Sequence, residues 1–239
     1  MPQAAIAVFA RAPVAGKAKT RLIPVLGARG AAGLQQALLR RTLATVLGAA
    51  LGPVSLWCAP DCAHAEFRRC RDEFGVQLFP QQGCDLGERM LRAVTQVGAH
   101  GNVLVVGSDC PALTVGELRA AARALDTGND VVLIPAEDGG YVLLGLRRPV
   151  FELFADVPWG TVRVLAITRE RLHRAGLTWH ELTESWDVDR PEDLARLLAI
   201  EPSFSMELAH ALTKMLAVCT PAKLHGQSDG RRSRPAHNG

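Results

Sequence analysis

Short apolar runs alternate with longer segments of mixed polarity along most of the chain. The runs are rich in Val, Leu, Ile and Ala and contain few polar residues, which is typical of strands buried on both faces of a parallel sheet. This pattern predicts strands over residues 4–9, 53–58, 76–79, 103–106 and 130–135, and a further strand that begins at Tyr141.

The segments between these runs carry apolar residues at helical spacing, as Leu39, Leu43 and Val46 do. Strands that alternate with helices favour an α/β fold, with a single mostly parallel sheet and helices on both faces. The predicted helices cover residues 31–47, 63–74, a stretch that ends near Ala99, 115–125, 162–175, a segment after Pro191, and 203–218.

We find no internal repeat and no linker within the main body of the chain, so we expect one domain over residues 1–201. A C-terminal helix over 202–219 and a disordered tail over 220–239, rich in Gly, Ser, Pro and Arg, are expected to follow.

The formal net charge is +3, and the last 20 residues carry four basic side chains and one acidic one. The rest of the chain is therefore close to neutral, which argues against nucleic acid as a partner. No apolar run approaches the roughly 20 residues of a membrane span. The N-terminus also lacks the features of a secretory signal. We expect a cytoplasmic protein that is not an integral membrane protein.

The predicted strand over residues 103–106 ends in Gly107-Ser108-Asp109-Cys110-Pro111. Open α/β sheets bind their ligands at the carboxyl ends of the strands, which makes Asp109 a candidate ligand for Mg²⁺ or Mn²⁺. The alternative is that Ser108, Asp109 or Thr114 caps the helix that follows.

The loop after the first predicted strand contains Pro13, Gly16 and four cationic side chains. Such a loop can bind phosphate groups through its positive charge and its donors. Its sequence matches neither a P-loop nor a dinucleotide-binding fingerprint. A solvated cationic loop is the alternative. The four cations are Arg11, Lys17, Lys19 and Arg21.

Further carboxylates follow the later strands. Asp138 precedes Gly139 and Gly140, which permit close approach of the backbone to a ligand. Asp187 and Asp189 share one face of an extended segment and suit a divalent cation, although one of them could instead cap the helix that begins at Pro191. Trp159 could line the rim of a pocket.

Taken together, these segments resemble the bacterial GT-A-type, glycosyltransferase-like proteins of the nucleotide-diphospho-sugar transferase superfamily. The motifs, in chain order, are Phe9-x-Arg11-x-Pro13-x-x-Gly16-Lys17-x-Lys19-Thr20-Arg21-Leu22, Gly83-x-Asp85-Leu86-Gly87-x-Arg89-Met90, Gly107-Ser108-Asp109-Cys110-Pro111, Asp138-Gly139-Gly140-Tyr141 and Asp187-Val188-Asp189-x-Pro191-Glu192-Asp193-Leu194.

This resemblance implies a Rossmann-like GT-A fold whose first loop, with Arg11, Gly16, Lys17, Lys19 and Arg21, binds the phosphates of a nucleotide. Asp85 and Arg89 are assigned to the same ligand. Asp109 takes the position of the metal-binding carboxylate, and Asp187 or Asp189 completes the site, because Ser108-Asp109-Cys110 offers only one acidic ligand. Gly139, Gly140, Tyr141 and Trp159 then face an acceptor, with Asp138 as its catalytic base.

We therefore expect a transferase that uses a nucleotide-activated donor, most simply a glycosyltransferase that takes a nucleotide sugar and needs Mg²⁺ or Mn²⁺. The first alternative is a guanylyltransferase-like nucleotidyltransferase, which couples a nucleoside triphosphate to a phosphorylated small acid. A second alternative is a non-catalytic nucleotide-binding protein. The pattern identifies neither the base, the sugar, the acceptor nor the oligomeric state.

Overall fold

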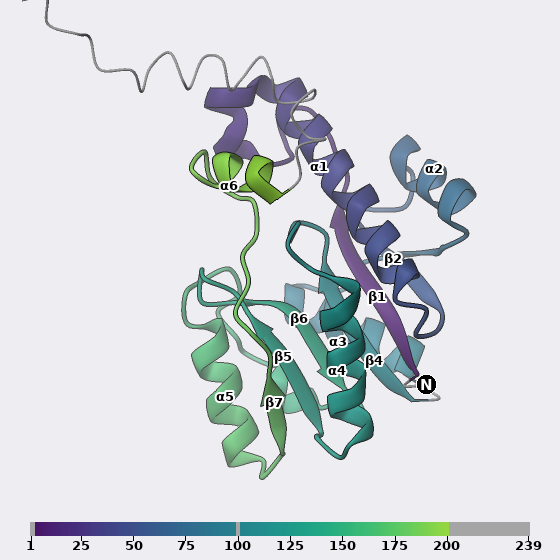
Figure 1. Cartoon of the computed structure of the whole chain (residues 1–239), viewed down its shortest axis with the longest axis vertical. Helices are drawn as coiled ribbons and strands as arrows, with labels where there is room; N and C mark the ends of the chain where they lie inside the picture. The colour runs from purple at the N-terminus through teal and green to yellow at the C-terminus, as the bar shows by residue number, and fades with distance from the viewer. Residues whose placement is uncertain (1–2, 99–100, 201–239) are drawn as a thin grey trace, which may run out of the picture.

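The computed structural model describes residues 3–98 and 101–200, which form one seven-stranded sheet with helices on both faces (Figure 1). The helix expected over 202–219 and the tail over 220–239 lie outside the described residues. The sheet order is β3-β2-β1-β4-β6-β5-β7. The strands are β1 (Ala4–Arg11), β2 (Val54–Ala59), β3 (Gln77–Pro80), β4 (Asn102–Gly107), β5 (Val131–Pro135), β6 (Tyr141–Leu146) and β7 (Trp179–Glu181).

The helices follow the predicted pattern with one clear difference at the start of α1, where residues 23–30, read as loop, are helical. Pro24 fits the first turn of a helix, and a kink at Gly27 (φ 71°) separates this turn from the rest. The helices are α1 (Ile23–Gly48), α2 (Ala65–Phe74), α3 (Leu86–Val97), α4 (Val115–Asp126), α5 (Val164–Arg174) and α6 (Asp193–Ile200), with short 3₁₀ turns η1 (Thr20–Leu22) and η3 (Phe151–Leu153).

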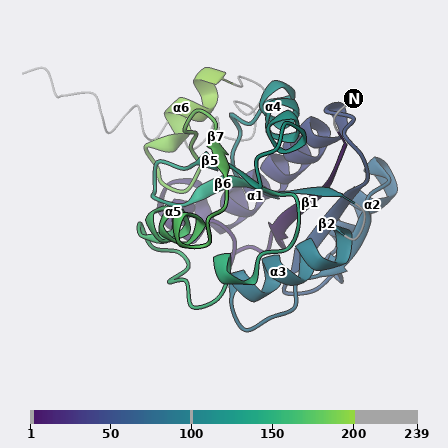
Figure 2. The same ribbon diagram turned by 90° about the horizontal axis from the view of Figure 1, so that it is seen from below.

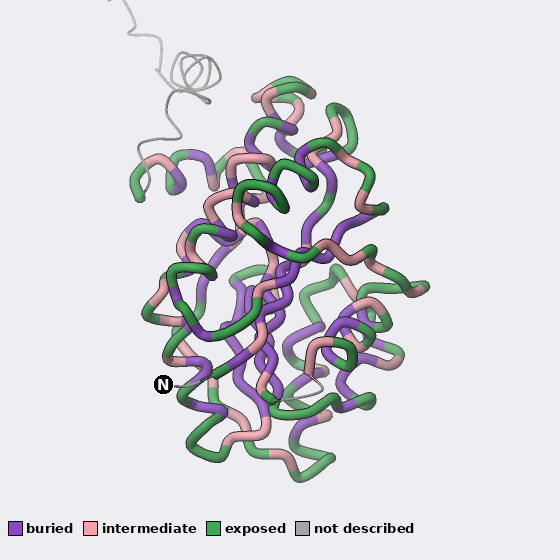
Figure 3. Tube along the Cα trace, turned by 90° about the vertical axis from the view of Figure 1, so that its right-hand side faces the viewer, coloured by how far each residue is buried: buried purple, intermediate pink, exposed green. Residues whose placement is uncertain are grey.

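Both faces of the sheet are buried, as the uniformly apolar runs predict (Figure 3). In β4, Leu104 and Val106 pack with α1, α2 and α4, whereas Val103 and Val105 pack on the other face with α3 and α5 (Figure 2). This alternation follows from the two-residue repeat of a strand. A third cluster joins the first turns of α1 to α6 through Leu34, Trp186 and Val188.

Two departures from a purely parallel sheet decide where the candidate residues lie. β6 pairs antiparallel with both β4 and β5, so the loop over residues 136–140 is a hairpin connection. The start of β6 therefore lies at the same edge of the sheet as the ends of β1, β4 and β5. β7, which the apolar pattern did not predict, pairs parallel with β5 and directs the chain to this edge as well.

Among the described residues, no helix is long and apolar enough to cross a lipid bilayer.

Candidate functional site

Three carboxylates meet at the carboxyl edge of the sheet, between the ends of β4 and β5. One oxygen each from Asp109, Asp187 and Asp189 lies within 4.8 Å of the others, and we call these residues the carboxylate trio. β1 and β4 are neighbours, but the strands that the chain forms next, β2 after β1 and β5 after β4, lie in opposite directions along the sheet. Such a switch point is where open α/β folds bind ligands.

Backbone hydrogen bonds hold the segment that carries Asp187 and Asp189 close to Asp109. The amide of Val188 donates to the carbonyl of Asp109 at 3.0 Å, and the amide of Ser185 donates to the carbonyl of Pro135 at 2.9 Å. The thiol of Cys110 lies 3.3 Å from the Ser185 hydroxyl. Residues 185–189 therefore cross the ends of β5 and β4, which explains why residues 78 positions apart in the sequence share one site.

The capping alternatives are excluded for Asp109 and Asp189. Thr114 caps α4 and forms a capping box with Glu117. The amides of Asp189 and Arg190 donate to the carboxylate of Asp193, at 2.9 and 2.7 Å. Neither Asp109 nor Asp189 therefore serves as a helix cap.

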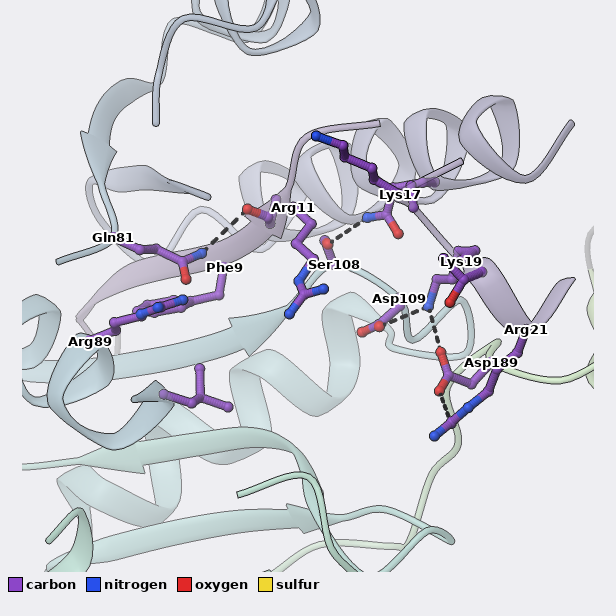
Figure 4. Close-up of a pocket in the computed structure, with 15 residues that line it drawn as sticks. Phe9, Arg11, Lys17, Lys19, Arg21, Gln81, Arg89, Ser108, Asp109 and Asp189 are labelled. Atoms are coloured by element: carbon purple, nitrogen blue, oxygen red, sulfur yellow. Dashed lines mark hydrogen bonds and ion pairs between the residues drawn. The ribbon is translucent and has the colours of Figure 1, made fainter. Parts of the chain in front are cut away.

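The loop between β1 and α1 places Lys19 directly between two members of the trio (Figure 4). Its Nζ donates to Asp109 Oδ2 at 2.9 Å and to Asp189 Oδ1 at 3.2 Å, and its side chain is only 4% exposed. Arg21 reaches the other oxygen of Asp189 at 2.7 Å. Lys19 has a left-handed backbone (φ 44°), which non-glycine residues seldom adopt. Strain of this kind is found where a functional side chain must be held in place.

Burial alone would lower the pKa of Lys19, but attraction to Asp109 and Asp189 raises it above its ordinary value. Lys19 is therefore a permanent cation within the site. Asp187 forms no ion pair with another residue that the structure describes. Burial, followed by the charges of Asp109 and Asp138, raises its pKa from 3.8 to about 6. The trio thus carries more negative charge than Lys19 neutralises.

The first loop lines a cleft of about 610 Å³ together with Asp109 and Asp189, and we call this cleft the basic compartment (Figure 4). Asp187, the third member of the trio, lies outside this lining. Five cationic side chains line it, three of them exposed, and none of the sequence-predicted cations is missing from it. Its lining consists of Phe9, Ala10, Arg11, Lys17, Ala18, Lys19, Thr20, Arg21, Gln35, Gln81, Leu86, Arg89, Ser108, Asp109 and Asp189.

A second hollow of about 220 Å³, the apolar compartment, shares Phe9, Leu86 and Asp109 with the basic compartment. The apolar compartment is lined by Phe9, Leu86, Met90, Val105, Val106, Gly107, Asp109, Ala136, Asp138, Gly140, Tyr141, Val142, Trp159, Gly160, Thr161, Val164 and Asp187. Of the residues predicted to face an acceptor, Gly140, Tyr141 and Trp159 line this compartment and Gly139 does not. The predicted base, Asp138, lines it as well.

Three predicted site residues lie elsewhere. Gly16 (φ 80°) forms the turn of the first loop, and Gly139 lines a neighbouring surface cleft with Asp138 and Asp187. Asp85 is the N-cap of α3, where its carboxylate accepts a bond from the amide of Glu88 at 2.8 Å. Its capping geometry explains why an acidic residue stands there, so a role toward the nucleotide stays a prediction.

Two polar residues of the basic compartment, Gln35 and Gln81, were not predicted from the sequence. Gln35 Nε2 donates to the Ser108 hydroxyl at 3.3 Å. Gln81 Nε2 donates to the carbonyls of Ala10 (3.3 Å) and Trp57 (2.9 Å). Both glutamines belong to segments whose pattern indicates only a helix or a loop, so only the three-dimensional arrangement identifies them.

The trio fits a hard divalent cation. Its donors are all carboxylate oxygens, the ligands that Mg²⁺ and Mn²⁺ prefer. Burial is the largest cause of the raised pKa of Asp187, and the charges of Asp109 and Asp138 raise this pKa further; a bound cation would offset both effects. Lys19 already neutralises part of the charge, so the ion would share Asp109 and Asp189 with this side chain.

Comparisons with known proteins identify the family and the fold of this chain. The model of a family described as uncharacterized proteins conserved in bacteria (DUF2064) matches residues 42–161. A phosphoenolpyruvate guanylyltransferase from Rubrobacter xylanophilus is 33% identical over 201 residues, which cover 81% of this chain and 95% of that protein.

Two solved structures share the fold. A candidate nucleotide-diphospho-sugar transferase from Desulfovibrio desulfuricans G20 is 29% identical, with a TM-score of 0.76, and the match covers 91% of this chain and 96% of that one. A cytidylyltransferase from Leptospira borgpetersenii is 14% identical, with a TM-score of 0.59 and coverage of 97% and 100%.

These relatives are transferases, which confirms the expectation of a transferase enzyme. The α/β fold with one mostly parallel sheet is confirmed as well. The comparisons support a nucleotide-dependent transferase, but they do not single out the GT-A glycosyltransferases that the sequence motifs resemble. The chain belongs to the DUF2064 family, with the fold of the nucleotide-diphospho-sugar transferases.

Proposed function

We propose that this protein transfers a nucleotidyl group from a nucleoside triphosphate to an oxygen atom of a second substrate, with Mg²⁺ or Mn²⁺. One observation carries the proposal: at the switch point of the sheet, a loop rich in cations lines one cleft with Asp109 and Asp189, and Asp187 completes the carboxylate trio beside this cleft. The relationship to a guanylyltransferase supports a triphosphate as the donor.

The cations of the basic compartment suit a triphosphate. Arg11, Lys17 and Arg21 are exposed and lie at its wall, so they can bind phosphate oxygens without losing a buried partner. Arg89 is half-buried, and its Nε is held by the carbonyl of Gly83 at 3.1 Å. Charge-assisted bonds of this kind are stronger than neutral ones, and they also stabilise a leaving group whose negative charge increases.

The trio would hold the divalent cation, which when bound neutralises phosphate charge and orients the donor. Lys19 would bring a fixed positive charge to the same place and keep Asp109 and Asp189 aligned. The burial of this lysine prevents its side chain from leaving the site easily.

The proposed reaction is a displacement at phosphorus. An oxygen of the acceptor forms a bond to the α-phosphorus of the donor, the bond from that phosphorus to the bridging oxygen breaks, and pyrophosphate leaves. Where the acceptor oxygen is a hydroxyl, its proton passes to a carboxylate. Asp138 is the candidate base, because it lines the apolar compartment together with Asp109 and Asp187.

A second candidate function is glycosyl transfer from a nucleotide sugar. The 29% identity to the D. desulfuricans structure favours it, since that protein is described as a candidate nucleotide-diphospho-sugar transferase. In this reaction the acceptor attacks the sugar carbon, and a nucleoside diphosphate leaves instead of pyrophosphate.

Product analysis distinguishes the two reactions. The protein is incubated with Mg²⁺ or Mn²⁺, with GTP, CTP, ATP, UTP or nucleotide sugars, and with a set of acceptors that includes phosphoenolpyruvate. Phosphorus NMR then identifies the leaving group. Pyrophosphate supports nucleotidyl transfer, whereas a nucleoside diphosphate released from a nucleotide sugar supports glycosyl transfer.

Binding is tested separately, through the melting temperature in the presence of each nucleotide. We expect at least one triphosphate to raise it when the divalent cation is present. If no nucleotide does so, both transferase proposals fail. A rise without turnover on any acceptor would favour the non-catalytic nucleotide-binding alternative. A location in the cytoplasm stays a prediction from the sequence.

A further inference from the structure

The walls of the apolar compartment are mainly aromatic and aliphatic. The rings of Tyr141 and Trp159 meet edge to face, with centroids 6.5 Å apart and planes at 87°. Leu86 and Met90 of α3 line the same hollow, and Phe9 lies at its boundary with the basic compartment. Aromatic edges and faces of this kind favour a flat apolar group.

The charges of this compartment are all negative. Asp109, Asp138 and Asp187 line it, whereas none of the described residues that line it is Lys, Arg or His. This composition contrasts with the basic compartment, where five cations gather. An anionic group placed here would meet Asp138 and Asp187, whereas Lys19 is bonded to Asp109 and Asp189 and lines the basic compartment. Repulsion between like charges therefore disfavours an anion in this hollow.

The position of Asp138 is fixed by its own loop. Its Oδ1 accepts a bond from the amide of Gly140 at 2.9 Å, and Gly139 has a positive φ of 86° beneath the carbonyl of Val162. The neighbouring carboxylate of Glu137 is directed elsewhere, because it pairs with Arg196 at 2.8 and 2.9 Å. Of these two adjacent acids, only Asp138 lines the apolar compartment.

We propose that the apolar compartment binds the acceptor and selects one whose group in this hollow is flat, apolar and either uncharged or cationic. The proposal rests on the proposed transfer, because it names the class of its second substrate. This class differs from the phosphorylated small acid of the nucleotidyltransferase alternative in the sequence analysis, and from the phosphoenolpyruvate in the name of the guanylyltransferase relative. Such an acid would bring negative charge to a hollow that already holds three carboxylates.

Tyr141 provides a direct reporter, because it is the only tyrosine of the chain. Protein labelled with ¹³C-tyrosine gives one set of ring signals, which needs no variant for its assignment. Four fragments with a similar ring test the proposal: benzyl alcohol, benzylamine, benzoate and phenyl phosphate. Spectra are recorded at millimolar fragment with Mg²⁺ present, so that any charge the ion contributes is included.

We expect benzyl alcohol and benzylamine to shift the Tyr141 signals in a saturable way, and benzoate and phenyl phosphate to bind at least about tenfold more weakly. The proposal is overturned if either anion binds as tightly as benzylamine. It is also overturned if none of the four fragments shifts the Tyr141 signals.

A pair of variants tests whether charge is the cause. The preference is the ratio of the dissociation constant of benzoate to that of benzylamine. Asp138→Asn should lower this ratio by about fivefold, because the substitution removes one negative charge from the wall of the compartment. The matched control Glu137→Gln should leave this preference unchanged. An unchanged preference in Asp138→Asn would contradict the assigned role of that carboxylate.

This experiment can fail independently of the proposed function. Nucleotide binding is measured by melting temperature and depends on the basic compartment, whereas the fragments report on Tyr141. Tight binding of phenyl phosphate with intact nucleotide binding would overturn only the acceptor class. Fragment binding without any effect of nucleotides would overturn only the nucleotide transfer.

Discussion

The basic and apolar compartments share one boundary but are built in different ways. The cations of the basic compartment stand mainly on a loop, and several of them are exposed to solvent. The apolar compartment combines strand ends, α3 and the start of α5 with loop residues such as Asp138 and Trp159, and Val105 and Val106 of β4 lie in its wall. Asp109 belongs to both compartments.

This difference indicates a division of tasks. A loop that carries several cations can adapt to a charged, flexible phosphate chain, whereas a wall formed by strands and a helix presents a fixed shape. The carboxylate trio lies where the two compartments meet, so donor and acceptor would approach each other there. The following variants test this division, beginning with the largest expected effect.

Asp109→Asn should reduce turnover by about 10²–10³-fold, the range found when one group that stabilises a transition state is removed. Both compartments depend on this carboxylate, so no other single change is expected to cost as much. Pyrophosphate release measures the effect, and Asp72→Asn on the exposed side of α2 is the control. A turnover within threefold of the wild type, with pyrophosphate still released, would show that Asp109 lies outside the reaction.

Gly139→Ala should destabilise the protein by about 2–3 kcal/mol and disturb the apolar compartment. A Cβ at this position would lie 2.3 Å from the carbonyl oxygen of Val162, and the φ of 86° adds strain. Urea denaturation measures the loss.

Gly176→Ala is the matched control for this change. Gly176 also has a positive φ (63°), but no atom lies within 4 Å of the added Cβ. Only the backbone term of about 1 kcal/mol is expected there. Equal losses in the two variants would show that the contact with Val162 does not shape the loop.

Lys17→Ala should weaken nucleotide binding by about tenfold, the effect of losing one charge-assisted bond. The Tyr141 response to benzylamine should stay the same, because Lys17 lines only the basic compartment. Melting temperature over a nucleotide titration measures this, with Arg123→Ala on α4 as the control. A change in the Tyr141 response would break the separation of the two compartments.

Asp187→Asn has the smallest expected effect, and its sign depends on pH. The pKa of Asp187 in the folded protein, about 6, lies above the ordinary value of 3.8. Between about pH 4 and pH 6, Asp187 is therefore protonated in the native protein but ionised in the unfolded chain. The free energy of unfolding therefore falls, through this group, as the pH rises from about 4 to about 6. In EDTA at pH 7, Asp187→Asn should gain about 1 kcal/mol, after allowance for partial exposure.

This gain should disappear as the pH approaches 4, and Mg²⁺ should raise the melting temperature of the wild type more than that of the variant. Asp130 gives a control of opposite sign, because bonds from the amide and hydroxyl of Thr178 hold its pKa below 3.8. Asp130→Asn should lose stability at neutral pH. A stability difference for Asp187→Asn that does not change with pH would contradict the assigned environment.

Much of the fold follows from the sequence, because the strands buried on both faces leave an unmistakable apolar pattern. Residues 103–106 and 131–135 are examples, and both strands occur where predicted. The direction of β6 does not follow from this pattern, because an apolar run has the same composition whether the strand is parallel or antiparallel to its neighbours. β7 has only three residues, Trp179-His180-Glu181, and they do not form an apolar run. It is a strand because it pairs with β5, which the sequence pattern does not show.

The sequence predicts most residues of the site but not the contacts between them. The charges of Asp109, Lys19 and Asp189 and their positions after strands indicate a ligand site. Nothing in the sequence indicates that Lys19 lies between the two carboxylates, since that depends on its left-handed backbone and on the path of residues 185–189. The pKa of Asp187 depends on the same folded arrangement.

The central claim is that a nucleoside triphosphate and a divalent cation bind together at the carboxylate trio. Calorimetric titration of GTP into the protein, with Mg²⁺ and then with EDTA, tests it in the wild type and in Asp109→Ala. We predict binding by the wild type that requires Mg²⁺, and no metal-dependent binding by an Asp109→Ala protein whose circular dichroism is unchanged. Undiminished binding by this folded variant would contradict the claim.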